Sequence, residues 1–546
     1  VGGGVVIFSM ALEDGSPRRR GTPLLCAVLM AGLCVGVGGE SSIPVLDVYR
    51  MVQYDQGDAM LGSRRSGVSM LASPSAKGEV SRKAVVLDFN SVTEELLDEL
   101  IGTKPAGALI IVLPENLGEL SDQQRATWMK AESNLMKRKA PMSVYFTVDG
   151  EEARAMKAKV EQNMGDVKLV VPPDANTARI KKIEAENFQG VLAGGGSEPG
   201  DSAAADTAPT IAVVAYYDTF GVAPGLAMGA DSNGSGVIAL LELARLFGKL
   251  YTAGKNRGNY NLIFVLTAGG KMNFAGARSW LSNTDVRLLD TIEFALCLES
   301  VGLGSELFLH TSKPLKDPTL SKLFGTLSSV GAGMDVKVSH VHKKVNISDT
   351  TVNWEHEQFS RKRILAGTLS RHPQVDTAAR NTIIDTKVDP EVLKRNILLI
   401  ANALARHIYG TPASLEIFSA TNSVQDHFLA AWSNGVSNEP RVVGMPTVAQ
   451  SPTAATPLVA RAYRVLKDTC TETSSHKFII DGDKSFYRGA INAKMSVYAV
   501  RPISFDMIYC VCVLTYLLGL LIFMQGTVEA RNTIVELFKG RKRKRA

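Results

Sequence analysis

An α/β fold is predicted for most of this chain of 546 residues. Apolar runs of strand length alternate with helical stretches over residues 44–190, and the same alternation returns over 209–410. A further apolar stretch, over 503–524, is long enough for one C-terminal transmembrane helix. Since 45% of the residues are hydrophobic, the chain can bury more than one core. These observations predict two α/β regions, each a sheet with flanking helices, followed by a membrane anchor.

The start of the chain has the pattern of a secretory signal peptide, for which Met10 is the candidate initiator. Three arginines over 18–20 precede an apolar run over 24–37, and small residues follow. This order of regions is typical of a cleaved signal, and the run is shorter than the ~20 residues that a spanning helix needs. Residues 10–39 are therefore predicted to be a signal peptide, with an uncleaved signal anchor as the alternative.

Residues 44–190 are predicted to form an N-terminal luminal α/β segment with a mostly parallel sheet, because its strands and helices alternate. Ser121 is a suitable N-cap for the second of its two helices. We find no catalytic constellation in this segment. The expected strands lie at 84–89, 107–114, 142–148 and 166–172, and the expected helices at 92–101 and 121–138.

Residues 209–410 are predicted to form the second α/β domain, and residues 411–502 a more polar C-terminal luminal region. In that region a helix is expected at 457–469, whereas 485–500 could be either helix or strand. For the domain, strands are expected at 210–217, 261–268, 294–300 and 306–312, and helices at 236–251, 318–330 and 390–409.

The stretch over 503–524 is predicted to cross a lipid bilayer once. The basic residues of the tail, 525–546, would then lie in the cytosol, as the positive-inside rule requires, and the signal peptide would place the N-terminal part in the lumen. Both signals predict a single-pass type I topology. Two Asn-x-Ser sequences, at Asn233 and Asn346, would be glycosylation acceptors in a luminal domain.

Charge and cysteine content exclude two further classes of protein. The net charge of +6 comes mainly from the arginines near the start and the basic residues at the end, so no direct nucleic-acid partner is expected. The six cysteines have neither metal-ligand nor disulfide-framework spacing. Cys297 and Cys470 could form one bridge, but Cys297 lies in a strand-like run, which favours a buried free thiol.

Five segments carry a resemblance to a known family. They are VYRMVQYD (48–55), YYDTFGVAP (216–224), GADSNGSGV (229–237), AGGKMNF (268–274) and WEHEQF (354–359). With them, residues 209–409 resemble the M28-type zinc aminopeptidase fold, and within it the nicastrin-related membrane glycoproteins of the endoplasmic reticulum. Active M28 members hold two zinc ions with histidine and carboxylate ligands, and a glutamate acts as the general base on the bridging water.

Most of these positions are changed in this sequence. By this resemblance the first ligand histidine is Tyr216, the bridging aspartate is Ser232, and the glutamate pair is Gly270-Lys271. Glu299 and His356 keep ligand types. The resemblance therefore implies no catalytic residues, no bound metal and no other cofactor.

Two further expectations concern this site. Asp218 keeps its place beside the lost histidine, and a salt bridge from Lys271 to Glu299 or Asp218 would substitute for the ion. A glycan on Asn233, within the former catalytic loop, would crowd the mouth of the cleft.

The resemblance implies a non-catalytic endoplasmic reticulum protein. It would be a subunit of a translocon- and ribosome-associated complex for multi-pass membrane protein biogenesis, with a Nodal modulator protein and a small multi-pass membrane protein as partners, and with a link to antagonism of Nodal signalling. One alternative is a residual zinc aminopeptidase that uses Asp231, Glu299 and His356. Another is a receptor that keeps the cleft and binds peptides by their free amines.

Overall fold

The computed structural model describes residues 44–162, 167–174, 178–180, 182–195, 208–252, 256–412, 417–418, 422–443, 456–482, 484–500, 507–522 and 535. Pro44–Tyr498 form one compact unit. The predicted signal peptide (10–39) lies outside the described residues, as does the basic tail (525–546) apart from residue 535.

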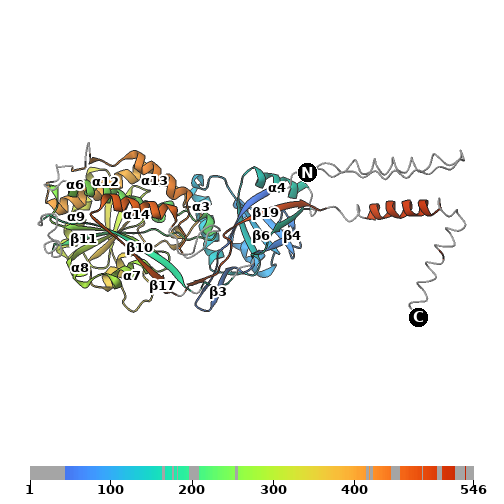
Figure 1. The fold of residues 1–546 in the computed structure, drawn as a ribbon, viewed down its shortest axis with the longest axis horizontal. Helices are drawn as coiled ribbons and strands as arrows, with labels where there is room; N and C mark the ends of the chain where they lie inside the picture. The colour runs from blue at the N-terminus through green and yellow to red at the C-terminus, as the bar shows by residue number, and fades with distance from the viewer. Residues whose placement is uncertain are drawn as a thin grey trace, which may run out of the picture. The chain divides into compact units, whose positions relative to one another are not determined.

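The N-terminal segment forms a closed barrel rather than an open sheet (Figure 1). The strands predicted at 84–89, 107–114 and 142–148 are β5, β6 and β8, which are parallel neighbours, whereas the one predicted at 166–172 is β9, which pairs antiparallel with β4. Antiparallel strands then close the sheet on itself, since β1 pairs with both β8 and β19. In barrel order the strands are β1 (Val45–Arg50), β19 (Asn492–Ala499), β9 (Val167–Val171), β4 (Val68–Ser73), β5 (Lys83–Asp88), β6 (Ala108–Leu113) and β8 (Ser143–Val148).

Helices and a small sheet accompany the barrel. The predicted cap at Ser121 is confirmed: its hydroxyl accepts from the Gln124 amide while the Gln124 side chain accepts from the Ser121 amide. The helices are α2 (Glu94–Asp98), its π-helical continuation η2 (Glu99–Thr103), α3 (Asp122–Met136) and α4 (Glu151–Gln162), with short 3-10 turns η1 (Phe89–Ser91) and η3 (Leu117–Glu119). The small sheet is β18 (Lys484–Phe486), β2 (Gln53–Gln56), β3 (Ala59–Ser63) and β7 (Lys139–Ala140).

An eight-stranded mixed sheet organises the second domain (Figure 1). At its centre β11 lies between β12 and β13, parallel to both. All seven residues of β11 and of β12 are buried, so helices must cover both faces. In sheet order the strands are β15 (Lys337–His342), β14 (Glu306–Thr311), β16 (Ala366–Ser370), β13 (Ile292–Leu298), β11 (Thr210–Tyr216), β12 (Asn261–Thr267), β10 (Ile183–Leu192) and β17 (Glu472–Ile480).

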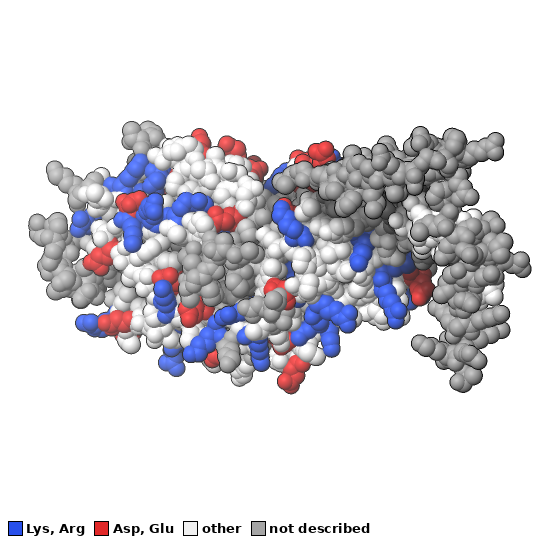
Figure 2. All heavy atoms as spheres, turned by 45° about the vertical axis from the view of Figure 1, so that its right-hand side comes forward, with Lys and Arg blue, Asp and Glu red and all other residues white. Residues whose placement is uncertain are grey.

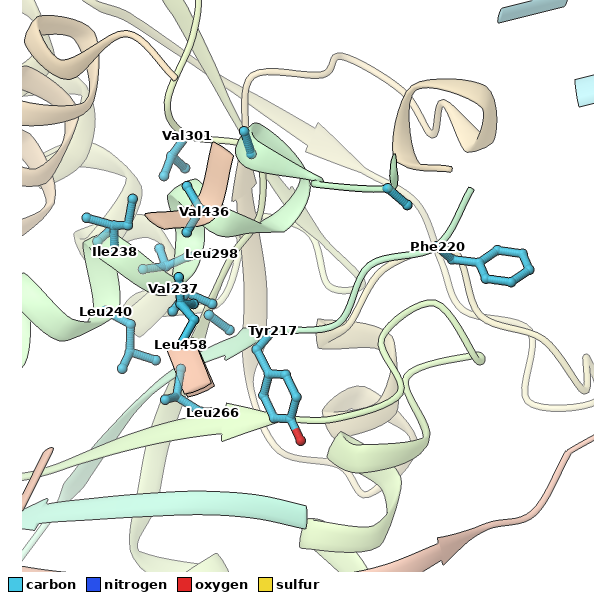
Figure 3. Packing of buried hydrophobic residues seen from close by; sticks show 14 of the residues in the cluster. Tyr217, Phe220, Val237, Ile238, Leu240, Leu266, Leu298, Val301, Val436 and Leu458 are labelled. Atoms are coloured by element: carbon cyan, nitrogen blue, oxygen red, sulfur yellow. The ribbon is translucent and has the colours of Figure 1, made fainter. Parts of the chain in front are cut away.

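Alternate residues of the central strands face different helix layers. Ile211 and Val213 belong to the cluster that contains α6, α9 and α12, whereas Ala212 and Val214 pack with α7 and α10. Figure 3 shows the first of these layers, in which Val237 of α6 packs with Leu298. The helices of this domain are α6 (Gly236–Thr252), α7 (Ala275–Asn283), α8 (Val286–Thr291), α9 (Pro318–Gly333), α10 (His356–Arg361), α11 (Thr377–Arg380), α12 (Pro390–Tyr409), α13 (Asp426–Asn438) and α14 (Pro457–Thr469), with short turns η4 (Pro224–Leu226) and η5 (Ala230–Ser235).

The C-terminal region predicted at 411–502 contributes strands to all three sheets. The helix expected at 457–469 is α14, and the ambiguous stretch at 485–500 forms strands, β18 and β19. Strand β17 pairs with β10 along its whole length, whereas β19 pairs with β1 of the barrel. Strands β17 and β19, late in the sequence, therefore complete the large sheet and the barrel.

Part of the predicted transmembrane stretch (503–524) is described. Residues 507–522 are helical, but among the described residues we find no helix that meets the length and hydropathy needed to cross a membrane.

Two sequence expectations about thiols and charge can be compared with the fold. Cys297 and Cys470 are both free thiols, and Cys297 is buried, as favoured above. Acidic and basic side chains are interspersed over the face seen in Figure 2.

Candidate functional site

The ends of four parallel strands bring the predicted positions together. Strands β11, β12, β13 and β16 run in one direction, so the residues after them gather at one edge of the sheet. Asp218 follows β11, Lys271 follows β12 and Glu299 follows β13. His356, at the start of α10, bonds through Nδ1 to Thr368 Oγ1 of β16 at 2.8 Å. This is the edge at which α/β enzymes commonly bind their ligands.

Tyr216 fills the space that a general base would need. Its side chain is only 1% exposed, and its ring lies against Gly270. A Cβ atom at Gly270 would lie 2.2 Å from Cγ of that ring, which is far inside any allowed contact. Burial raises the pKa of the Tyr216 phenol well above its ordinary value, so the ring stays neutral. The two replacements fit each other: a tyrosine at the former histidine position leaves room only for glycine at the former glutamate position.

Lys271 does not form the salt bridge that we expected from the sequence. Its Nζ donates instead to Ser232 Oγ at 2.9 Å, to the Ser232 carbonyl at 3.0 Å and to the Arg380 carbonyl at 2.6 Å. Burial lowers its pKa to about 8, against the raising effect of the Glu299 charge. The ammonium group thus fastens three loops together through neutral oxygen atoms.

Two aspartates hold backbone amides rather than a metal ion. The Asp218 carboxylate accepts from the amides of Gly270 at 2.7 Å and Lys271 at 3.0 Å. The Asp385 carboxylate accepts from the amides of Asp231 at 2.9 Å and Ser232 at 2.8 Å. Each carboxylate therefore fixes the shape of one of the loops that would carry catalytic groups in a peptidase.

Arg380 is the partner of Glu299, and the sequence did not indicate it. Its Nε and Nη2 atoms donate to the two oxygens of Glu299, with the Nη2 bond at 2.9 Å, while Nη1 donates to the Asn353 carbonyl at 2.6 Å. The guanidinium carbon also lies 4.5 Å from the centre of the Trp354 ring. The glutamate that resembles a zinc ligand is thus neutralised by a fixed side-chain cation.

The residual-peptidase alternative needs Asp231, Glu299 and His356 to converge, and they do not. Asp231 accepts from Arg371 Nε at 2.6 Å, Glu299 binds Arg380, and His356 binds Thr368. Burial also lowers the pKa of His356 to about 3, which keeps its imidazole neutral. Among the described residues no cluster of three or more His, Cys, Asp or Glu side chains could hold a metal ion. The donor set does not fit zinc because arginines occupy the positions beside both carboxylates.

The expected glycan on Asn233 does not fit the structure. The side chain is fully buried, and its Nδ2 donates to the carbonyls of Tyr216 at 3.1 Å and Leu298 at 2.8 Å. Its Oδ1 accepts from the Ser300 amide. A glycan would be attached at Nδ2 and would break both of its bonds. The side chain instead ties the end of β11 to the end of β13. Asn346 lies in an exposed turn, where an acceptor side chain is accessible.

Two further buried charges brace the site, and sequence analysis missed both. Arg441, 1% exposed, donates to the carbonyls of Tyr217 at 2.8 Å and Gly229 at 2.9 Å. Glu132 of α3 accepts from the amides of Val222 at 3.2 Å and Ile383 at 3.1 Å, which ties the N-terminal segment to two loops of the site. Neither residue belongs to a recognisable motif, since each acts on backbone groups far away in the sequence.

At these positions the described side chains hold loops together. A peptidase of this fold needs a metal-bound water and a general base. Here the base position is a glycine under a tyrosine ring, and a lysine follows it.

Comparison with known proteins places the chain among named relatives. Residues 199–387 match the model of peptidase family M28. The mouse protein named "BOS complex subunit NCLN" is 33% identical over 498 residues, which are 86% of this chain and 87% of that protein. The Caenorhabditis elegans protein named "Nicalin" is 28% identical over 569 residues, 94% of this chain and 95% of that one. Among solved structures, a zinc aminopeptidase from Bacillus subtilis is 13% identical with a TM-score of 0.34, covering 74% of this chain and 91% of its own.

Proposed function

The chain belongs to the nicalin family of BOS complex subunits, and from this premise we propose that it is a non-catalytic subunit of a membrane protein complex of that kind. The observation that carries the proposal is the 33% identity over 86% of the chain to a relative named as such a subunit. The state of the cleft supports the non-catalytic part, because Tyr216 stands where the resemblance places a ligand histidine and Arg380 pairs with Glu299, where it places a ligand carboxylate.

The membrane in question would be that of the endoplasmic reticulum. The ectodomain would lie in the lumen, with Asn346 carrying a glycan, and the stretch over 503–524 would cross the bilayer with the basic tail in the cytosol. The signal-like segment at 10–39 and the exposed turn at Asn346 support this orientation. By resemblance, the complex would act with the translocon in the biogenesis of multi-pass proteins, beside a Nodal modulator protein and a small multi-pass partner.

Co-purification tests the subunit role. The full chain with a C-terminal tag would be isolated from membranes in a mild detergent, and its partners identified by mass spectrometry. We expect membrane partners in fixed proportion to the chain. An unrelated type I protein isolated in the same way is the control for detergent carry-over, and recovery of the chain without enriched partners would contradict the proposal.

A direct assay tests the non-catalytic part. The purified chain would be incubated with zinc and aminoacyl p-nitroanilides over a range of pH. We expect release of p-nitroaniline no faster than from buffer with zinc. If a chelator abolishes release while the Arg380→Ala variant releases p-nitroaniline at the same rate as the unchanged chain, that result would instead indicate a working metal site elsewhere in the chain.

A further inference from the structure

A cavity of about 460 Å³ opens beside the former catalytic loops. It is bounded by the turn after β12, the loop before α10, the segment around α11 and the turn between β17 and β18. Its volume is within the range of pockets that bind small molecules or peptide side chains. Four cationic side chains and one carboxylate are among its lining residues: Lys271, Arg278, Arg380, Lys484 and Asp481.

Two of these cations are already committed to the protein. Lys271 Nζ donates to three oxygen atoms, and Arg380 is fixed by Glu299 and the Asn353 carbonyl. They cannot turn toward a ligand, but their position sets the electrostatic potential of the cavity floor.

Lys484 is the first of two cations at the cavity that could bind a ligand. It is half-buried, and its Nζ lies 5.2 Å from the ring centre of Phe220 and 5.9 Å from that of Tyr54. Among the described residues its ammonium has no hydrogen-bond or ion-pair partner. Burial in this setting lowers its pKa. An ammonium held against aromatic faces keeps its three donors free for an anion.

Two other polar groups at the cavity also have unused capacity. Arg278 uses Nη2 to bind the Asp481 carbonyl at 2.7 Å, and the other donors of its exposed guanidinium have no partner among the described residues. The buried side-chain oxygen of Asn381 has no hydrogen-bond partner in the described part of the chain. A buried amide of this kind costs free energy unless a ligand or water satisfies it.

We propose that this cavity binds a carboxylate carried by a peptide segment, with Lys484 and Arg278 as its donors and Asn381 as an additional polar contact. Phe274, Val352 and Ile480 supply apolar walls that suit the neighbouring part of a peptide. An aminopeptidase must accept a free amino group, whereas the uncommitted cations Lys484 and Arg278 would repel one. The fold would therefore have kept the cleft and reversed the charge that it selects.

The test uses the full chain purified in a neutral detergent and isothermal titration calorimetry. Three blocked tripeptides separate the sources of the carboxylate: Ac-Ala-Phe-Glu-NH₂, Ac-Ala-Phe-Gln-NH₂ and Ac-Ala-Phe-Ala with a free C-terminus. We expect the glutamate or the free-acid peptide to bind about tenfold more tightly than the glutamine peptide, as a charge-assisted hydrogen bond would give. Whichever acid binds better identifies the carboxylate. Equal binding of all three would overturn the proposal.

Two substitutions locate the site. Lys484→Gln should weaken binding of the preferred acidic peptide about tenfold, whereas Lys477→Gln, an exposed lysine on β17 outside the cavity, should leave it unchanged. Thermal unfolding checks that each variant is folded. If Lys484→Gln does not fold, Arg278→Gln, a substitution at an exposed position, replaces it in the binding measurement. A folded variant with undiminished binding would overturn the assignment. Displacement of the peptide by inorganic phosphate, at a concentration at which acetate does not displace it, would also overturn the assignment, because the site would then prefer phosphate.

This binding is measured on the isolated chain. Peptide binding can therefore be absent while the complex still co-purifies, and it can be present if no complex is found, so the two proposals are tested separately.

Discussion

The carboxyl ends of the parallel strands differ between the two sheets of this protein. In the barrel, β5 ends at Asp88, whose carboxylate is 56% exposed and pairs with Lys157 at the surface. In the large sheet, β13 leads into Glu299, whose side chain is 2% exposed and pairs with Arg380 at 11%. An exposed ion pair contributes little to stability, whereas a buried charge is costly unless it is paired. The same strand geometry thus carries replaceable charges in one sheet and mutually dependent charges in the other.

The largest effect should come from breaking a buried pair. Arg380→Ala leaves Glu299 buried without a counter-charge, and we expect a loss of about 3–5 kcal/mol in the free energy of unfolding. Urea unfolding measures it.

The barrel supplies the matched control for that experiment. Arg154→Ala removes an arginine that is 60% exposed and pairs with Glu115, so its effect should be below about 1 kcal/mol. The double variant Arg380→Met with Glu299→Leu should recover most of the loss, since apolar residues can replace a buried ion pair. If Arg380→Ala costs no more than Arg154→Ala, the contrast between the two sheets is wrong.

A smaller steric effect is expected at the former base position. Gly270→Ala places Cβ 2.2 Å from the Tyr216 ring, and such overpacking should cost about 1–3 kcal/mol. Gly325→Ala in α9, where a Cβ meets open space, should instead be stabilising by about 1 kcal/mol. Thermal unfolding compares them, and adding Tyr216→Ala to Gly270→Ala should remove the clash. Equal melting temperatures for the two single variants would refute the steric fit.

The buried carboxyl of Glu355 should make stability depend on pH. One of its oxygens accepts from Thr267 Oγ1 at 2.6 Å, the other has no hydrogen-bond partner among the residues that the structure describes, and burial raises the pKa of Glu355 to about 8. Because the folded pKa lies above the unfolded value, this contribution is present at acid pH and is lost as the pH rises from about 4.5 through about 8.

Glu355→Gln should therefore flatten the decline of unfolding free energy between pH 5 and pH 8, whereas the exposed Glu115→Gln should not. Denaturant titrations at several pH values measure the slope. The effect is smaller than that of an unpaired charge because the carboxyl can take up a proton instead. An unchanged slope in Glu355→Gln would show that another group, such as Glu132 with its pKa raised to about 7, controls it.

The smallest effect concerns the asparagines of the two Asn-x-Ser sequences. Asn346→Gln should change stability by less than about 0.5 kcal/mol, because the side chain is exposed, and should abolish the shift in gel mobility that a glycosidase produces. Asn233→Gln should leave that shift in place while lowering the melting temperature, since it breaks three buried hydrogen bonds. A glycosidase shift that survives Asn346→Gln would contradict the assignment.

Local patterns predicted several helices and central strands, whereas α4 and the buried strand β16 were not predicted. The cap at Ser121, the helix at 457–469 and the central strands β11 and β12 follow from side chains within each segment. The edge strand β17 could not be predicted in this way. Its residues are mostly polar and exposed, and its pairing with β10 joins segments almost 300 residues apart in the sequence.

The side-chain partners at the site also could not be predicted from local patterns, because they are distant in the sequence. The lost ligands Tyr216 and Ser232 were apparent from the motifs, because they occupy known positions. Their replacements were not: Arg380 lies 81 residues after Glu299, and the contact of Gly270 with Tyr216 depends on shape rather than on residue type. Charge alone suggested Lys271 as the partner of Glu299, whereas the fold gives that role to an arginine that can bind both oxygens.

Strands β17 and β19 have a consequence for synthesis. Because β17 forms the edge of the large sheet and β19 closes the barrel, neither sheet can be completed until the ribosome has translated both strands. Until then β1 and β10 each have one edge without its final neighbour, and such open edges invite wrong pairings. Folding of the compact unit Pro44–Tyr498 should therefore be a late, nearly single event, and a chain truncated before residue 472 should be retained by chaperones rather than yield a stable fragment.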